Sequence, residues 1–156
     1  MRITQWGEYG IHCAAYIAAQ EKLGAVSVSA QDISDSQMID IQYAQQILQR
    51  LRKNNIVKSI RGPHGGYKLS RPASDISLCD LLQAAEGDTF ELICEQRPIN
   101  STRCTPDSAC SLRPVWQKLK THINGFLQSV KLEELLNDSL GHETPVKISR
   151  HSQSGL

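Results

Sequence analysis

The hydrophobic period changes abruptly between residues 41 and 71, and this change limits the folds open to the chain. Apolar residues recur at helical spacing through IQYAQQILQRLRKNN, which begins at Ile41. The next two segments, IVKSI and YKLSR, alternate as short strands, and the turn sequence RGPHGG between them predicts a β-hairpin. Ser29 can cap a short upstream helix, AQDISDSQ. Two short helices followed by a hairpin predict a winged helix-turn-helix between about Val26 and Pro72.

Further helices are predicted on both sides of this unit. Thr4 can cap a helix that runs to about Gln20, and a helix over SLCDLLQAAEG ends at Gly87. From Leu112 to about Asn137 an apolar stripe predicts one long helix, which either wraps a small domain or pairs with a copy of itself. We therefore expect a mainly α fold with a small β-hairpin wing. The expected divisions are a winged helix-turn-helix domain (1–90), a cysteine-bearing loop (91–111), a long helix (112–138) and a disordered tail (139–156).

Charge is distributed unevenly along the chain, although the formal net charge is only +1. Residues 41–74 contain no Asp or Glu but seven Lys and Arg, whereas residues 75–95 contain six acidic residues and no Lys or Arg. A nearly neutral chain can in this way present a positive face to a polyanion. Charge alone leaves open a solvated basic face without a partner. The length of the acid-free stretch nevertheless favours double-stranded DNA as the partner.

The predicted helix and hairpin in the basic window have the dimensions and chemistry to contact duplex DNA. An α-helix about 10–12 Å wide fits the major groove, where exposed Gln side chains can donate to and accept from base edges. Basic side chains can hold phosphates, and a glycine-containing tip lets the hairpin approach the minor groove. The candidate DNA-binding residues are Gln42, Tyr43, Gln45, Gln46, Gln49, Arg50, Arg52, Lys53, Lys58, Arg61, His64 and Gly65.

Other broad classes of protein find little support in the sequence. No apolar run approaches the roughly 18 residues needed to cross a bilayer, and MRITQWGEYG lacks the apolar stretch of a secretory signal. We therefore expect a cytoplasmic protein without a membrane partner. GPHGG lacks the strand–loop–helix context and the Lys-Ser/Thr ending of a phosphate-binding loop, and no Ser/His/Asp arrangement or pair of catalytic carboxylates is recognisable. An enzyme is not expected.

The segment YAQQILQRLRKNNIVKSIRGPHGGYKLSRPASDISLCDLLQAAEG closely resembles the signature segment of the IscR, NsrR and RsrR regulators, the Rrf-type family. The resemblance covers about residues 1–137 and is most specific over LRKNNIVKSIRGPHGGYKL. It implies a homodimeric transcription factor that reads a palindromic operator, with the helix from Leu112 as the dimerisation helix. Many members carry an iron–sulfur cluster. Gln45 stands where several relatives have Glu, which leaves the preferred operator bases open.

The five cysteines fall into two groups. Cys13 and Cys79 lie on apolar faces of predicted helices, where a free cysteine commonly serves as a small buried hydrophobe. Cys94, Cys104 and Cys110 share one loop, and three thiols in a reducing compartment point to metal or redox chemistry. Thiolates suit both zinc and iron–sulfur clusters. The residues alone therefore leave open a cluster, a structural zinc and a metal-free thiol switch.

The resemblance to the family also suggests a particular set of ligands. Some cluster-binding relatives carry a His three residues after the last loop Cys, but Arg113 stands there in this chain and cannot ligate. GEYGIHC resembles the RsrR N-terminal segment, which implies a redox-sensing [2Fe–2S] cluster at the dimer interface. Its ligands would be Glu8 and His12 of one chain and Cys104 and Cys110 of the other, with Cys94 spared. Alone, the i,i+4 pair Glu8 and His12 would be read as an ordinary surface pair. The competing set is Cys94, Cys104 and Cys110 with one oxygen or nitrogen ligand, and [4Fe–4S] and zinc remain alternatives to [2Fe–2S].

Overall fold

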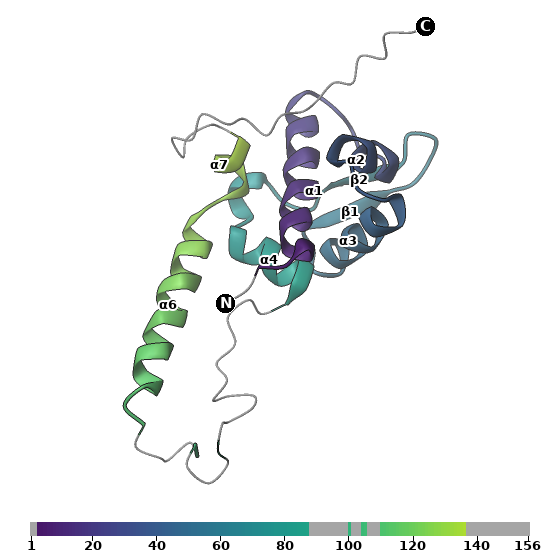
Figure 1. The fold of residues 1–156 in the computed structure, drawn as a ribbon. Helices are drawn as coiled ribbons and strands as arrows, with labels where there is room; N and C mark the ends of the chain where they lie inside the picture. Colours follow the sequence, from purple (N-terminus) through teal and green to yellow (C-terminus); the bar gives the residue numbers. More distant parts are fainter. Residues whose placement is uncertain (1–2, 88–99, 101–103, 106–109, 137–156) are drawn as a thin grey trace, which may run out of the picture.

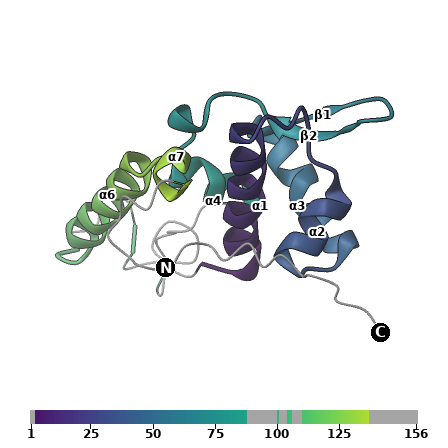
Figure 2. The same ribbon diagram turned by 90° about the horizontal axis from the view of Figure 1, so that it is seen from above.

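The computed structural model describes residues 3–87, 100, 104–105 and 110–136. Helix α1 runs through the middle of the fold, with α2, α3 and the hairpin on one side and α4, α6 and α7 on the other (Figures 1 and 2). The elements are α1 (Gln5–Lys22), α2 (Ala30–Gln37), α3 (Ile41–Lys53), β1 (Val57–Ile60), β2 (Gly66–Leu69), the 3-10 turn η1 (Ala73–Asp75), α4 (Leu78–Glu86), α6 (Arg113–Ser129) and α7 (Leu132–Leu136). The mainly helical fold with a small hairpin wing is therefore confirmed.

Short-range caps explain where the helices begin. The Thr4 side chain accepts a hydrogen bond from the backbone of Trp6 at the start of α1, as predicted. Ser29 forms a reciprocal capping box with Asp32 at the start of α2, and Ser77 forms one with Asp80 at the start of α4. Each cap satisfies backbone N–H groups that the first helical turn leaves without partners. These signals lie within a few residues of each other, so the sequence could reveal them.

The hairpin forms the predicted antiparallel pair, and a backbone bridge attaches it to the segment before α2. Val57 lies opposite Leu69, and Lys58 opposite Lys68. The backbones of Val28 and Tyr67 also exchange two hydrogen bonds of 2.9 and 2.7 Å. A Cβ atom at Gly66 would lie 2.4 Å from the carbonyl oxygen of Val28, so this close approach requires glycine. The wing is therefore fixed to the segment that precedes α2.

The core is built around α1. Its most extensive contacts are with α4, and a large buried cluster extends from α1 to α2, α3 and the hairpin. A second, smaller cluster, formed by Cys79, Leu82 and Leu127, joins α4 to α6. Cys13 and Cys79 are both buried, which confirms their predicted role as small core residues. No helix in the described part of the chain is long and apolar enough to cross a membrane.

The prediction of one continuous helix from Leu112 to about Asn137 was wrong, because the chain breaks at Val130. Val130 is buried and extended, with ψ 122°, and its carbonyl oxygen accepts a hydrogen bond from the backbone of Leu78. Leu132 donates in turn to the carbonyl of Ile76. These long-range backbone bonds replace the helical ones, and α7 begins only at Leu132. Apart from residues 100, 104, 105, 110 and 111, the predicted loop 91–111 and the tail 139–156 lie outside the described residues.

Candidate DNA interface and metal-ligand residues

The side chains of α3 divide into a buried and an exposed face. Ala44, Ile47, Leu48 and Leu51 are buried in the core. The four glutamines predicted to read base edges are all exposed to solvent: Gln42, Gln45, Gln46 and Gln49. Asp40 accepts hydrogen bonds from the first backbone N–H groups of α3 and fixes where the helix begins. The structure therefore presents on one surface the polar groups that a groove-reading helix needs.

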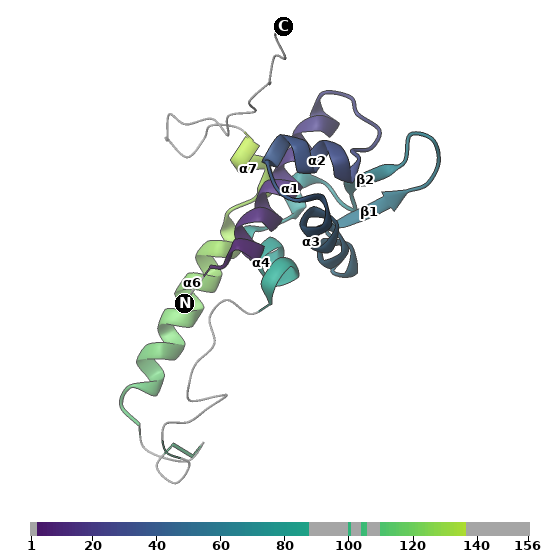
Figure 3. The ribbon, with the colours of Figure 1, turned by 45° about the vertical axis from the view of Figure 1, so that its right-hand side comes forward.

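The hairpin projects from the body of the protein beside α3 (Figure 3). Lys58, Arg61 and His64 are exposed, as are Arg52 and Lys53 at the end of α3. A long-range hydrogen bond that the sequence patterns do not predict holds the wing tip in place. The hydroxyl of Ser27 donates to the carbonyl oxygen of His64 at 2.6 Å, across 37 residues of chain, while Gly65 donates to Gly62 at 2.9 Å within the tip.

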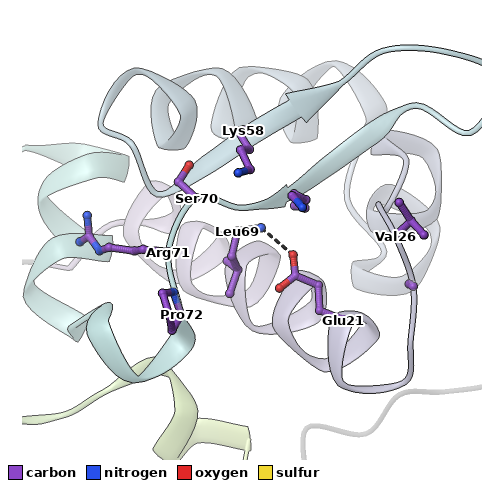
Figure 4. Close-up of a pocket in the computed structure, with 9 residues that line it drawn as sticks. Glu21, Val26, Lys58, Leu69, Ser70, Arg71 and Pro72 are labelled. Atoms are coloured by element: carbon purple, nitrogen blue, oxygen red, sulfur yellow. Dashed lines mark hydrogen bonds between the residues drawn. The ribbon is translucent and has the colours of Figure 1, made fainter.

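A hollow at the base of the wing collects positive charge (Figure 4). Lys58 and Lys68 lie directly opposite each other on the two strands, and like charges in such a pair repel. Neither forms an ion pair within the described residues, whereas Arg71 pairs with Asp80 at 2.9 Å. Glu21 lines the same hollow, but its Oε1 atom accepts a hydrogen bond from the backbone of Leu69. The hollow is suited to an anion such as a phosphate.

Two predicted DNA-binding residues, Tyr43 and Arg50, contact α1. The Tyr43 ring centroid lies 4.5 Å from that of Trp6 and 5.7 Å from that of Tyr9. Burial raises the pKa of the Tyr43 hydroxyl, Tyr9 adds to the increase and Arg50 opposes it. The Arg50 guanidinium lies 4.0 Å from the centre of the Trp6 ring and donates to the carbonyl oxygen of Ala85 at 2.8 Å. These two side chains thus connect α3 to its neighbours.

Glu8 and His12 form an accessible pair on α1. The distance from Glu8 Oε1 to His12 Nε2 is 3.5 Å, and the side chains are 64% and 36% exposed, respectively. Both can therefore approach a common point outside the protomer. A carboxylate and an imidazole are suitable ligands for iron or zinc, so the chemistry of this pair fits a metal site to which other ligands are added.

The cysteine candidates are only partly covered by the structure. Cys104 and Cys110 are half-buried, whereas Cys94 lies outside the described residues. The guanidinium of Arg113 donates to the carbonyl oxygen of Thr105 at 2.8 Å, which links the residue after Cys104 to the first turn of α6. Within the described part of one protomer, no three His, Cys, Asp or Glu side chains are placed to hold a metal ion.

Sequence reasoning missed Glu86, which fastens the N-terminus of α1 to the end of α4. Its Oε2 atom accepts hydrogen bonds from the backbone and the hydroxyl of Thr4, 82 residues away. Its Oε1 atom is buried and has no hydrogen-bond partner among the described residues. A Cβ atom at Gly7 would lie 2.8 Å from Oε1, so glycine makes room for the carboxylate. No local pattern marks this pairing.

Comparisons with known proteins agree with this arrangement. Residues 3–138 match the Rrf2 family, described as "Iron-dependent Transcriptional regulator". The chain is 36% identical over 138 residues to the HTH-type transcriptional regulator IscR of Photorhabdus laumondii, covering 88% of this chain and 80% of that one. It is 33% identical to IscR of Escherichia coli K12, covering 88% and 82% of the two chains.

Solved structures give the same result. The structure of CymR (YrzC), titled the global cysteine regulator of B. subtilis, matches with a TM-score of 0.69 and 26% identity over 86% of this chain and 95% of that one. T. potens IscR matches with a TM-score of 0.69 and 26% identity over 92% of each chain. The family consists of regulators rather than enzymes. This chain therefore belongs to the Rrf2 family of DNA-binding transcriptional regulators.

Proposed function

We propose that this regulator is a cytoplasmic homodimer whose binding to a palindromic operator depends on a redox-active [2Fe–2S] cluster at the dimer interface. The observation that carries the proposal is the position of Glu8 and His12. They are exposed on the same helix whose aromatic residues Trp6 and Tyr9 contact Tyr43 of α3. A change at the ligand pair that shifts α1 can therefore reach the groove-reading helix through these aromatic contacts.

The exposed face of α6 supports the dimer. Several large apolar side chains of this helix and its N-terminal flank are exposed, and Phe126 is 65% exposed. They are Leu112, Val115, Trp116, Leu119 and Phe126. A second copy of the same helix would cover them, and twofold pairing is the commonest arrangement of soluble oligomers. Residues 112–138 would then form the dimerisation region beside a DNA-binding unit in residues 1–90.

The DNA contacts follow from the surfaces already described. The exposed glutamines of α3 would read base edges in the major groove, while Arg52, Lys53 and Lys58 would hold phosphates. Arg61, His64 and Gly65 would place the wing tip at the minor groove. Because a dimer reads half-sites at a fixed separation, a small rotation of α3 in each protomer is enough to weaken binding.

The donor set fits a cluster shared between two chains. Glu8 and His12 would come from one protomer, and Cys104 and Cys110 from the other, with Cys94 spared. A bound cluster would supply a charge that changes with oxidation state. Accessible loop thiols suit this role better than Cys13, because burial raises the pKa of that thiol to about 12. The competing set uses all three loop cysteines with an oxygen or nitrogen ligand such as Glu8.

Anaerobic purification, followed by visible absorption, EPR, and iron and sulfide analysis, tests the cluster. We expect a coloured protein with two irons and two sulfides per site. Glu8→Ala and His12→Ala should each lose the cluster, while His122→Ala, an exposed histidine on α6, should keep it. A colourless protein with stoichiometric zinc would contradict the proposal and favour a zinc regulator. A protein without metal that forms reversible disulfides would favour a thiol switch. If Cys94→Ala is the only one of these substitutions that abolishes the cluster, the ligand set that includes Glu8 and His12 is wrong.

Two solution measurements test the dimer and the DNA interface. Leu119→Glu should turn a dimer into a monomer in sedimentation velocity, because it places a charge in the proposed apolar contact. Thr121→Glu, on an exposed position of the same helix, is the matched control. Binding to a duplex selected from a random-sequence library should weaken steeply with salt, with about −0.9 added to the log–log slope for each phosphate contact. A monomer in the wild type, or a flat salt response, would contradict the proposal.

A further inference from the structure

Arg50 differs from the other basic residues of α3 in having defined partners inside the protein. Its guanidinium lies 4.0 Å from the centre of the Trp6 ring on α1. One terminal nitrogen, Nη1, donates to the carbonyl oxygen of Ala85 in the last turns of α4 at 2.8 Å. Arg50 is exposed, as are Arg52 and Lys53 further along the helix, but no side-chain partner is found for Arg52 or Lys53 among the described residues.

These contacts use the properties that distinguish arginine from lysine. The planar guanidinium can stack on an aromatic face and at the same time donate in its own plane, which a compact ammonium group cannot do. Ala85 is 1% exposed, so a carbonyl in this position would lose a good partner if Arg50 swung out toward DNA. Asn54 reinforces the same junction, because its side-chain amide donates to the carbonyl oxygens of Arg50 and Ala84.

The junction joins three elements. Arg50 belongs to α3, Trp6 to the first turn of α1 and Ala85 to the end of α4. Trp6 also packs on Tyr43, one of the first residues of α3, so the tryptophan touches the groove-reading helix near both of its ends. Trp6 is therefore held between two side chains of α3, in addition to the buried core contacts that α1 and α3 share.

We propose that Arg50 is a positioning residue that locks the groove-reading helix onto α1 and α4, and that it does not bind a DNA phosphate. Trp6 lies two residues before Glu8. On the proposed function above, Arg50 and Trp6 also transmit the state of the ligand pair to α3.

Salt dependence distinguishes a positioning residue from a phosphate ligand. Full-length Arg50→Ala, Arg50→Lys and Arg52→Ala are titrated in metal-free form with a fluorescent duplex selected from a random-sequence library. We expect both Arg50 variants to bind on the order of tenfold more weakly, equivalent to about 1.4 kcal/mol, with the salt slope of the wild type. Arg52→Ala should instead reduce the slope by about 0.9. The proposal is overturned if Arg50→Ala makes the salt slope shallower by the same amount as Arg52→Ala, and Arg50→Lys has the affinity and the salt slope of the wild type.

Tryptophan emission provides a readout that does not depend on DNA or metal. The chain has two tryptophans, so Trp116→Phe leaves Trp6 as the sole emitter. In this background Arg50→Lys should shift the Trp6 emission, whereas Arg52→Ala should not. Circular dichroism checks that each variant remains folded. Identical spectra for folded Arg50→Lys and its parent would overturn the stacking contact and the proposal with it.

A third measurement addresses the transmission step alone. The ratio of duplex affinities between the cluster-loaded and metal-free forms should move toward one in Arg50→Lys and stay unchanged in Arg52→Ala. An unchanged ratio in Arg50→Lys would overturn transmission through Arg50. A wild-type protein that holds no cluster would defeat the proposed function, while the salt and emission experiments would still decide the positioning role.

Discussion

The contact between Gly10 of α1 and Ala85 of α4 gives the sharpest test of the packing. A Cβ atom added at Gly10 would lie 2.6 Å from the Cβ of Ala85, whereas carbon atoms pack about 3.5–4.0 Å apart. A Cβ atom is fixed to the backbone and cannot rotate away, so Gly10→Ala must push the two helices apart. The same substitution also has a favourable effect, because alanine stabilises a helix interior by about 1 kcal/mol relative to glycine.

The size of the overlap decides which effect is larger. Overpacking in a close-packed core costs typically about 1–3 kcal/mol. An overlap of roughly 1 Å between two helix backbones belongs to the upper part of that range. We therefore expect Gly10→Ala to destabilise the fold by about 1–2 kcal/mol. For a chain of this length, that corresponds to a melting temperature about 2–8 °C lower.

A double-mutant cycle measured by thermal and urea unfolding would check the reasoning. Ala85→Gly removes the opposing methyl group, so Gly10→Ala should then bring only its gain in helix propensity. The same substitution is thus expected to destabilise the wild type but to stabilise the Ala85→Gly protein by about 1 kcal/mol. An effect of the same sign in both backgrounds would refute the described contact between α1 and α4.

Three further predictions concern the wing, the acid limb and the thiols. Gly66→Ala should separate the hairpin from Val28 and weaken DNA binding, and amide exchange at Tyr67 should accelerate in the folded protein; unchanged exchange would count against the attachment. Burial opposes ionisation of Asp80, but hydrogen bonds from Ser77 and the Arg71 charge outweigh it and lower its pKa. Its stabilising contribution should therefore be complete at neutral pH and lost as pH falls below about 4. In urea unfolding, the free energy of unfolding of Asp80→Asn should fall less steeply with acidification than that of the wild type. An equal fall in both proteins would contradict this. At pH 8 the folded protein should resist alkylation at Cys13 while Cys104 reacts. Peptide mapping by mass spectrometry measures the order, and faster alkylation of Cys13 would contradict the prediction.

The parts of the fold that sequence predicted well are those set by neighbouring residues. The caps at Thr4 and Ser29 and the hairpin turn need only a few adjacent side chains and a change of hydrophobic period. The break at Val130 depends instead on backbone groups of Ile76 and Leu78, about 50 residues away. No periodicity within residues 112–137 contains that information. Long-range hydrogen bonds therefore overrode a regular helical pattern.

The site shows the same division between local and distant information. The exposed glutamines follow from the apolar spacing of α3 alone. Arg50 is indistinguishable from Arg52 by charge, and only Trp6 and Ala85, brought close by the fold, give it a different environment. The ligand roles of Glu8, His12, Cys104 and Cys110 remain predictions, and Cys94 lies outside the described residues. The hydrogen bonds from Thr4 to Glu86 likewise could not be predicted from sequence spacing.

The break at Val130 has a mechanical consequence for α6. The helix is joined to the body by the backbone bonds of Val130 and Leu132 to Leu78 and Ile76, and by packing of Leu127 and Ile123 against α4. The part of α6 before Ile123 makes an arm about 15 Å long. A rotation of about 10° at its attached end would displace the far end by roughly 3 Å over such an arm. Cys110 lies just beyond that far end, so the arm would amplify small angular changes beside α4 into large displacements of this thiol.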